Sequence, residues 1–300
     1  MDFGKLNDVS KVDFSLADDH FFTAQQLKPS QHQPTVYVGP PIWSNREWVG
    51  KIYPHYAKEA DFLSHYSRQF NTIELNVTHY QIPTLATIQR WREATVTDFK
   101  FCPKFPQVIS HDRQLIGCDG ITQQFCENIL ALEEKLGCSF LQLNQGFDTR
   151  MLPILEKYLR VLPKNFPVAI EFRHPSWFQD ERAWAETLAM LQEKNIGTVM
   201  TDVAGRRDAL HMSLSNSTFM LRFVGNELHP TDFERIKAWA KRLAIWLENG
   251  LETAYIFVHC GENIFAPELT KFWIDEINAT CGLQIKPPSI QPKIIQGSLF

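Results

Sequence analysis

The stretch PVAIEFRHPSW, Pro167 to Trp177, joins a buried strand to charged residues at the end of that strand. Alternation along a strand places Glu171 and Arg173 on one face together with Ala169, opposite a face of apolar bulk. Strands of a parallel α/β sheet are covered on both faces and are usually apolar throughout. An acid and a base on one such face therefore indicate either a buried structural ion pair or a functional site.

Seven further short segments resemble this strand in being apolar and rich in β-branched or aromatic residues. They alternate with amphipathic helical patterns, several of which begin at Thr or Asp and end near Gly, Asn or Pro. Eight alternations in roughly 220 residues favour an α/β fold of the (β/α)8 TIM-barrel type over a doubly wound sheet. We expect an N-terminal arm over residues 1–34, the barrel domain over 35–282, and a Pro-rich extended tail over 283–300. The predicted strands cover residues 36–40, 71–77, 99–104, 139–144, 167–172, 197–202, 218–224 and 252–258.

The composition excludes several classes of protein. Of the 300 residues 44% are hydrophobic, and the formal net charge is -4, so the chain as a whole is not a basic nucleic-acid coat. The sequence has neither a signal-peptide pattern at its start nor an apolar run that approaches a membrane span, and we expect a cytoplasmic protein. The 6 cysteines show no C-x-x-C spacing of a metal site.

Alternation on the other strands gathers polar side chains on one shared face, which we predict to line the barrel interior. These residues fall at or near the C-terminal ends of their strands, where barrel enzymes carry their catalytic groups. Charges buried without partners are costly, so the pattern favours a site over a purely structural role. The bases suit an anionic or polyhydroxylated ligand. The predicted polar inner set comprises Glu74, Asn76, Lys104, Gln142, Asn144, Glu171, Arg173, Asp202, Arg222 and His259.

Four motifs also resemble a known family. TIELNVTHYQIP, FKFCPKFPQVISH, VAIEFRHPSW and FMLRFVG are similar to segments of the YecE-like family, also called domain of unknown function 72, and the similarity runs from about Val36 to Ala279. The resemblance implies a TIM-type barrel with a polar pocket at the strand ends, but it implies no particular reaction. It adds Tyr80, His111, His174 and Trp177 to the expected site. Residues 39–45, 142–147 and 258–263 depart from the usual pattern of the family.

Paired carboxylates beside cations can act as general acid and base, so we expect Glu74, Glu171, Asp202 and His174 to be catalytic. The expected reaction is hydrolysis, with a phosphodiester or nucleotide-related substrate. The alternatives are a glycosidase-like or isomerase-like enzyme acting on a carbohydrate, and a barrel that binds an anion or sugar without turnover. A divalent metal held by the acids, His174 and His259 is a further alternative, although no metal-binding spacing occurs. Expected ligand-binding residues are Asn76, Tyr80, Lys104, His111, Arg173, Trp177, Arg222 and His259.

The last residues of the chain carry a second signal. In QGSLF, Gln296, Leu299 and Phe300 resemble the short motif by which bacterial replication and repair proteins dock the polymerase sliding clamp. The alternative is that Leu299 and Phe300 fold back as an apolar anchor on the barrel. The clamp interpretation favours a nucleic-acid substrate for the pocket.

Overall fold

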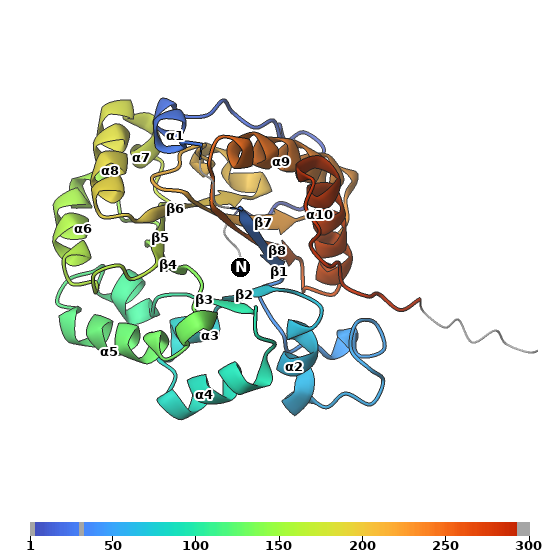
Figure 1. Ribbon diagram of the computed structural model, residues 1–300. Helices are drawn as coiled ribbons and strands as arrows, with labels where there is room; N and C mark the ends of the chain where they lie inside the picture. Colours follow the sequence, from blue (N-terminus) through green and yellow to red (C-terminus); the bar gives the residue numbers. More distant parts are fainter. Residues whose placement is uncertain (1–3, 30–32, 293–300) are drawn as a thin grey trace, which may run out of the picture.

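The computed structural model describes residues 4–29 and 33–292 (Figure 1). All eight predicted strands are present and are parallel to their neighbours, and helices surround them (Figure 1). The strands are β1 (Thr35–Gly39), β2 (Thr72–Leu75), β3 (Lys100–Pro103), β4 (Ser139–Gln142), β5 (Val168–Glu171), β6 (Gly197–Asp202), β7 (Thr218–Gly225) and β8 (Thr253–Cys260).

Several helix ends lie at the capping residues that the sequence predicts. The Thr84 and Asp180 side chains accept hydrogen bonds from the first-turn amides of α4 and α8, and Gly282 ends α10 in the left-handed conformation. The α-helices are α1 (Phe21–Gln26), α2 (Phe62–Ser67), α3 (Val77–Tyr80), α4 (Leu85–Ala94), α5 (Asp119–Leu130), α6 (Leu152–Leu159), α7 (Ser176–Gln179), α8 (Glu181–Glu193), α9 (Pro230–Glu248) and α10 (Ala266–Cys281). As expected, only a short 3-10 segment, Ala204–Ala209, follows β6.

The strands form two hydrogen-bonded sheets, one of six strands in the order β1-β8-β7-β6-β5-β4 and one of β2 and β3. We call the two gaps between these sheets, β1 to β2 and β3 to β4, the seams. At the first seam the Asn71 side chain replaces ladder bonds, because it accepts from the Val38 amide at 2.7 Å and donates to the Val36 carbonyl at 3.0 Å. At the second seam two isolated parallel bridges, Phe101 with Leu136 and Lys104 with Phe140, take the place of a continuous ladder. The α/β class with parallel strands is thus confirmed, whereas the sheet is not closed by continuous ladders.

Two apolar cores pack against the strands. The larger core lies between the strands and the surrounding helices and includes Trp177, Trp239 and Trp273. The smaller core lies on the opposite, inner face of the strands, as strand alternation requires. Its members are Cys102, Cys138, Phe140, Ala169, Val199, Met220, Tyr255 and Phe257. Burial of a side chain as large as Phe140 contributes about 1.5–3 kcal/mol, so this inner layer supports the polar residues that follow it on the same strands.

The N-terminal arm is bound to the six-stranded sheet and its helices. The Gly205 amide donates to the Gly4 carbonyl at 2.8 Å, which fixes the start of the described arm beside the end of β6. Further along, the Phe14 ring lies 4.7 Å from the Arg235 guanidinium, and Trp246 donates to Asp19 at 2.9 Å. The arm then enters α1, which is attached to the segment after β6 because the Thr23 hydroxyl donates to the Met212 carbonyl.

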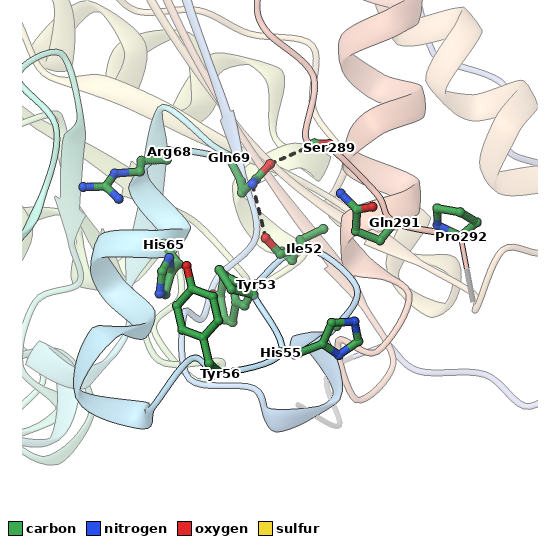
Figure 2. Close-up of a pocket in the computed structure, with 12 residues that line it drawn as sticks. Ile52, Tyr53, His55, Tyr56, His65, Arg68, Gln69, Ser289, Gln291 and Pro292 are labelled. Carbon is green, nitrogen blue, oxygen red and sulfur yellow. Dashed lines mark hydrogen bonds between the residues drawn. The ribbon is translucent and has the colours of Figure 1, made fainter. Parts of the chain in front are cut away.

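The start of the C-terminal tail, residues 283–292, follows α10 back along the outside of the molecule. The Asn278 side chain bonds both backbone groups of Ile285 at 2.8 Å. The Ser289 amide then donates to Gln69 next to α2 (Figure 2). The Gln291 amide donates to the Lys51 carbonyl. No helix in the described ranges combines the length and the apolar composition needed to cross a bilayer.

Candidate functional site

Arg222 lies at the centre of a buried ion network beneath the C-terminal ends of the strands. Its Nε and Nη2 atoms each donate to one oxygen of Glu74 at 2.9 Å, and its Nη1 atom donates to Glu171 Oε2 at 3.1 Å. Arg173 Nε donates to the other oxygen of Glu171 at 2.9 Å. Arg222 and Glu74 are fully buried and Glu171 is 1% exposed. The sequence prediction that β2, β5 and β7 direct charges to one place is therefore confirmed.

Neutral and cationic side chains extend the network upward. Gln142 at the end of β4 donates to Glu171 at 2.7 Å and accepts from Lys104 Nζ at 3.0 Å. On the other side Asn76 donates to Glu74 Oε1 at 2.8 Å, and His259 Nε2 lies 2.9 Å from Glu74 Oε2. Each Glu74 oxygen therefore contacts two polar groups, which is the arrangement that makes burial of a carboxylate tolerable.

Both carboxylates are held in the ionised form. Burial alone would raise the pKa of Glu74, but the charge of Arg222 and the hydrogen bonds from His259 and Arg222 outweigh it and hold this pKa well below its usual value. Burial likewise opposes ionisation of Glu171, and the charges of Arg173 and Arg222 with the Gln142 hydrogen bond lower its pKa to about 2. Neither carboxyl group therefore carries a proton at neutral pH that it could give to a leaving group.

Cations outnumber carboxylates in this network, and the pKa of Lys104 reflects the excess. Burial and the nearby Arg222 charge lower the pKa of Lys104 to about 8. Burial and the Lys104 charge also lower the pKa of His79 to about 4, which leaves that imidazole neutral at pH 7. An anion placed beside Lys104 would relieve the repulsion among the cations, so the electrostatics favour an anionic ligand.

A cavity of about 750 Å³ lies directly above the network. Lys104, Gln142, Asn76 and His259 line it, whereas Glu74, Glu171, Arg173 and Arg222 are absent from its lining and lie below its floor. Tyr80 lines the cavity as the family resemblance implied. Its other lining residues are Lys5, Leu6, Asn7, Asp8, Val9, Pro41, Ile42, His79, Val203, Val224, Gly225, Asn226, Glu227, His229, Gly261 and Asn263.

Several lining residues were missed by the sequence prediction. His79 was not assigned to the site, yet it lines the cavity; it is 7% exposed, and its Nδ1 atom lies 2.8 Å from the Phe105 carbonyl. Gln142 had been placed on the inner face but not assigned to the site. The arm residues Lys5 to Val9 could not be found, because no pattern in a polar segment predicts where it docks.

Asp202 does not lie at the cavity, and its predicted place on the inner face is wrong. Val199 belongs to the inner core, so alternation turns Asp202 outward toward α9. There it accepts from Trp239 Nε1 at 2.7 Å and pairs with Arg235 at 2.9 Å. The segment GTVMTD, residues 197–202, is equally apolar on both faces. The prediction therefore relied on its one charged residue, Asp202, which was assigned to the wrong face. Asp202 is thus a partner of buried helix residues rather than a catalytic acid.

Three residues added by the family resemblance also lie outside the cavity lining. Trp177 is fully buried, and its indole donates to the Phe147 carbonyl at 2.8 Å, so the expected ligand contact is wrong. His174, which was expected to be catalytic, has its Nδ1 atom 2.8 Å from the Ser176 hydroxyl at the start of α7. His111 packs edge-on against His79, with ring centroids 5.2 Å apart, and so lies behind a lining residue.

The donor set does not fit a metal ion. Within residues 4–29 and 33–292 no group of three or more His, Cys, Asp or Glu side chains is placed to hold one. The two network carboxylates have their oxygens directed at guanidinium groups, which would repel a second cation. The residues present therefore offer no site for the divalent metal considered from the sequence.

A second cavity of about 720 Å³ lies on the outside of the molecule, between residues 50–56, α2 and the tail (Figure 2). His55, Tyr56, His65 and Arg68 line it together with Gln291. It shares no lining residue with the cavity at the strand ends.

The similarity to known proteins covers nearly all of this architecture. The chain matches the model of the family "Protein of unknown function DUF72" over residues 37–292. It is 31% identical to UPF0759 protein YecE of Escherichia coli K12 over 283 residues, which cover 88% of this chain and 100% of that protein. It is also 28% identical to UPF0759 protein YunF of Bacillus subtilis 168 over 152 residues, or 48% of this chain and 52% of that protein. The chain therefore belongs to the YecE-like DUF72 family.

Solved structures agree with the fold. A DUF72 family protein from Enterococcus faecalis V583 superposes with a TM-score of 0.66 at 19% identity, covering 85% of this chain and 100% of that one. A DUF72 family protein from Thermotoga maritima MSB8 gives a TM-score of 0.55 at 25% identity, covering 75% and 92%. The family is one of unknown function, so an activity has to be inferred from the site.

Proposed function

We propose that the chain is a (β/α)8-type barrel hydrolase that acts on a small anionic ester, with a phosphate ester as the substrate class that fits best. The observation that carries this proposal is the position of His259, which lines the cavity while its Nε2 atom contacts Glu74, itself held by Arg222. The barrel part of the proposal is supported by the bonds that Asn71 and Lys104 make across the two seams.

In the proposed mechanism His259, rather than Glu171, is the proton carrier. If Nε2–H donates to Glu74, the lone pair on Nδ1 can accept a proton from an attacking water, and the Glu74 carboxylate stabilises the resulting imidazolium. The oxygen of that water bonds to the ester phosphorus, the ester P–O bond breaks, and His259 returns its proton to the leaving oxygen. Lys104 pairs with the negative charge on the phosphoryl oxygens.

Hydrolysis of nitrophenyl phosphates tests this mechanism. We expect the wild-type protein to release nitrophenol from p-nitrophenyl phosphate or bis(p-nitrophenyl) phosphate, and His259→Asn to lower kcat by roughly 10²–10⁴-fold, the usual effect of losing a general base. The control His55→Asn changes an exposed histidine of the outer cavity and should leave kcat unchanged. Equal rates for wild type and His259→Asn would contradict the assignment.

A binding protein without turnover is the second candidate, and the pairing of both network carboxylates with guanidinium groups favours it over a glycosidase. A glycosidase needs a carboxylic acid that is protonated near neutral pH, whereas both carboxylates here have lowered pKa values. A pure anion binder would be stabilised by inorganic phosphate in a saturable manner and would release no nitrophenol from either ester. Thermal unfolding with increasing phosphate, measured beside the activity assay, separates these two candidates.

We also propose that Gln296, Leu299 and Phe300 dock the polymerase sliding clamp; these residues lie outside the described part of the chain. The support is that the preceding tail is bound to the barrel up to Gln291, so the last residues start from an anchored point (Figure 2). Purified clamp should bind the wild-type chain in surface plasmon resonance and should not bind Phe300→Ala. Phe21→Ala, at another exposed phenylalanine, serves as the control. Absence of wild-type binding, with a lower melting temperature for Phe300→Ala, would instead support an anchor on the barrel.

A further inference from the structure

The N-terminal arm forms part of the wall of the strand-end cavity. Residues 5–9 line this cavity together with residues of β4, β7 and β8 and with Lys104, which directly follows β3. The family match begins only at residue 37, so this wall comes from a segment outside the matched region. The floor of the site and its wall therefore belong to two different parts of the chain.

Close backbone contacts hold the arm in this position. Gly4 has φ of +74°, and a Cβ added there would lie 2.9 Å from Val203 Cγ1. Val203 itself lines the cavity. A Cβ added at Gly205 would lie 2.8 Å from the Gly4 carbonyl oxygen, which accepts the Gly205 amide. Val9 is 6% exposed, so the other end of the lining segment is buried as well. Only glycine allows so close an approach at position 4.

The arm also brings charge to the cavity. Lys5 adds an ammonium group at the wall of the cavity, and Asp8 adds one carboxylate. A second ammonium group, that of Lys104, lies at the floor. Two ammonium groups contributed from different segments suit a ligand whose anionic group can be held from more than one side.

We propose that residues 5–9 determine the specificity of the site, by limiting it to a small phosphate-bearing molecule and by contacting the anion through Lys5. This inference rests on the proposed anionic-ester function and narrows its substrate class. A polymeric nucleic acid needs an open groove through which its strand can enter and leave. The arm narrows the cavity on the β6 side, so a nucleoside monophosphate fits the site better than an internal phosphodiester of a long strand.

Binding of three probes to the full-length protein tests the inference. The probes are inorganic phosphate, AMP and a fluorescent 12-nucleotide oligothymidylate, with affinities measured by calorimetry and fluorescence anisotropy. We expect wild type to bind phosphate and AMP but not the oligonucleotide. Gly4→Val should displace the wall, weaken AMP binding about tenfold and admit the oligonucleotide, and Lys5→Ala should weaken AMP and phosphate binding about tenfold through loss of a charged hydrogen bond.

Matched controls separate this inference from the proposed function. Lys11→Ala removes an exposed arm lysine outside the cavity lining, and Gly120→Val adds a side chain where an added Cβ meets nothing within 4 Å. Both should bind phosphate and AMP with wild-type affinity and, like wild type, should not bind the oligonucleotide. If wild type binds AMP and neither Gly4→Val nor Lys5→Ala changes affinity or size selectivity, the role of the arm is overturned and the proposed function stands. If wild type binds none of the anions, the proposed function itself is overturned.

Discussion

Arg222 and Glu74 lie 148 positions apart in the chain, yet two parallel N–H···O bonds of 2.9 Å join them in the fully buried centre of the molecule. Such a bidentate pair fixes both the position and the plane of the carboxylate. Because His259 contacts the same carboxylate, the orientation of its imidazole in the cavity follows from the Arg222–Glu74 pair. The predictions below test separate consequences of this arrangement.

Removal of one charge from the network should destabilise the fold. Glu171→Gln leaves Arg173 and Arg222 with less compensating charge in a buried place, and we expect the free energy of unfolding to fall by about 3 kcal/mol. Urea unfolding at pH 7 measures this change. The control Glu186→Gln breaks an exposed ion pair with Arg182 and should alter stability by less than about 0.5 kcal/mol. An unchanged or raised stability for Glu171→Gln would contradict the buried network.

Stability should also depend on pH through Glu171. Its pKa is about 2 in the folded chain and near 4.5 when unfolded, so the unfolded state binds more protons between these values. The stabilisation is fully present above about pH 4.5 and is lost as the pH falls toward 2, with a size of about 3 kcal/mol. Urea midpoints between pH 7 and pH 3 should therefore fall less steeply for Glu171→Gln than for wild type. Parallel curves for the two proteins would be inconsistent with a lowered pKa of Glu171.

Anion affinity should depend on Lys104 and on pH. Lys104→Met removes the ammonium group at the cavity floor and should weaken phosphate binding about tenfold at pH 7. In wild type the affinity should fall as the pH rises through about 8, because the Lys104 ammonium then loses its proton. Calorimetric titrations from pH 6.5 to pH 9.5 measure both effects, and the variant should lose this part of the pH dependence. A variant that retains the full wild-type pH profile would exclude Lys104 as the titrating group.

Asp202 provides a test of the corrected inner face. Asp202→Asn weakens the ion pair with Arg235 beneath α9, and we expect the free energy of unfolding to fall by about 2–3 kcal/mol. Because Asp202 faces away from the cavity, affinity for phosphate should remain that of wild type at temperatures where the variant is folded. If Asp202→Asn lost as much phosphate affinity as Lys104→Met, Asp202 would instead have to be part of the ligand-binding site.

Strand alternation predicted most of the site because five strands have one clearly apolar face. Glu74, Lys104, Glu171, Arg222 and His259 each follow an inner position, and each reaches the network or the cavity. The same rule failed at β6, where both faces are apolar enough to be buried. Trp177 was misplaced for another reason: an aromatic residue next to a site can as readily support the neighbouring loop from the core as contact the ligand.

Two further properties of the site depend on three-dimensional contacts that alternation does not encode. The sequence places Glu74, Glu171 and Arg222 on one face, but it does not predict that Arg222 lies between the two carboxylates. Because Arg222 pairs with both, both remain ionised. Likewise the polar segment from Lys5 to Val9 has no periodicity, and its contact with the cavity arises from the fit of Gly4 beside Val203. The ionisation states of the buried groups and the position of the N-terminal arm can therefore be found only from the folded structure.

The two seams give the ion network a mechanical role as well. β2 and β3 are joined to the remaining six strands chiefly by side chains such as Asn71 and by isolated bridges, so local opening of the molecule should begin there. Glu74 belongs to the two-stranded sheet, whereas Arg222 and His259 belong to the six-stranded sheet. The ion pair between Glu74 and Arg222 therefore joins the two sheets. Loss of Glu74 would speed amide-hydrogen exchange along β2 and β3. The same local opening would separate His259, the residue proposed as proton carrier, from the Lys104 ammonium.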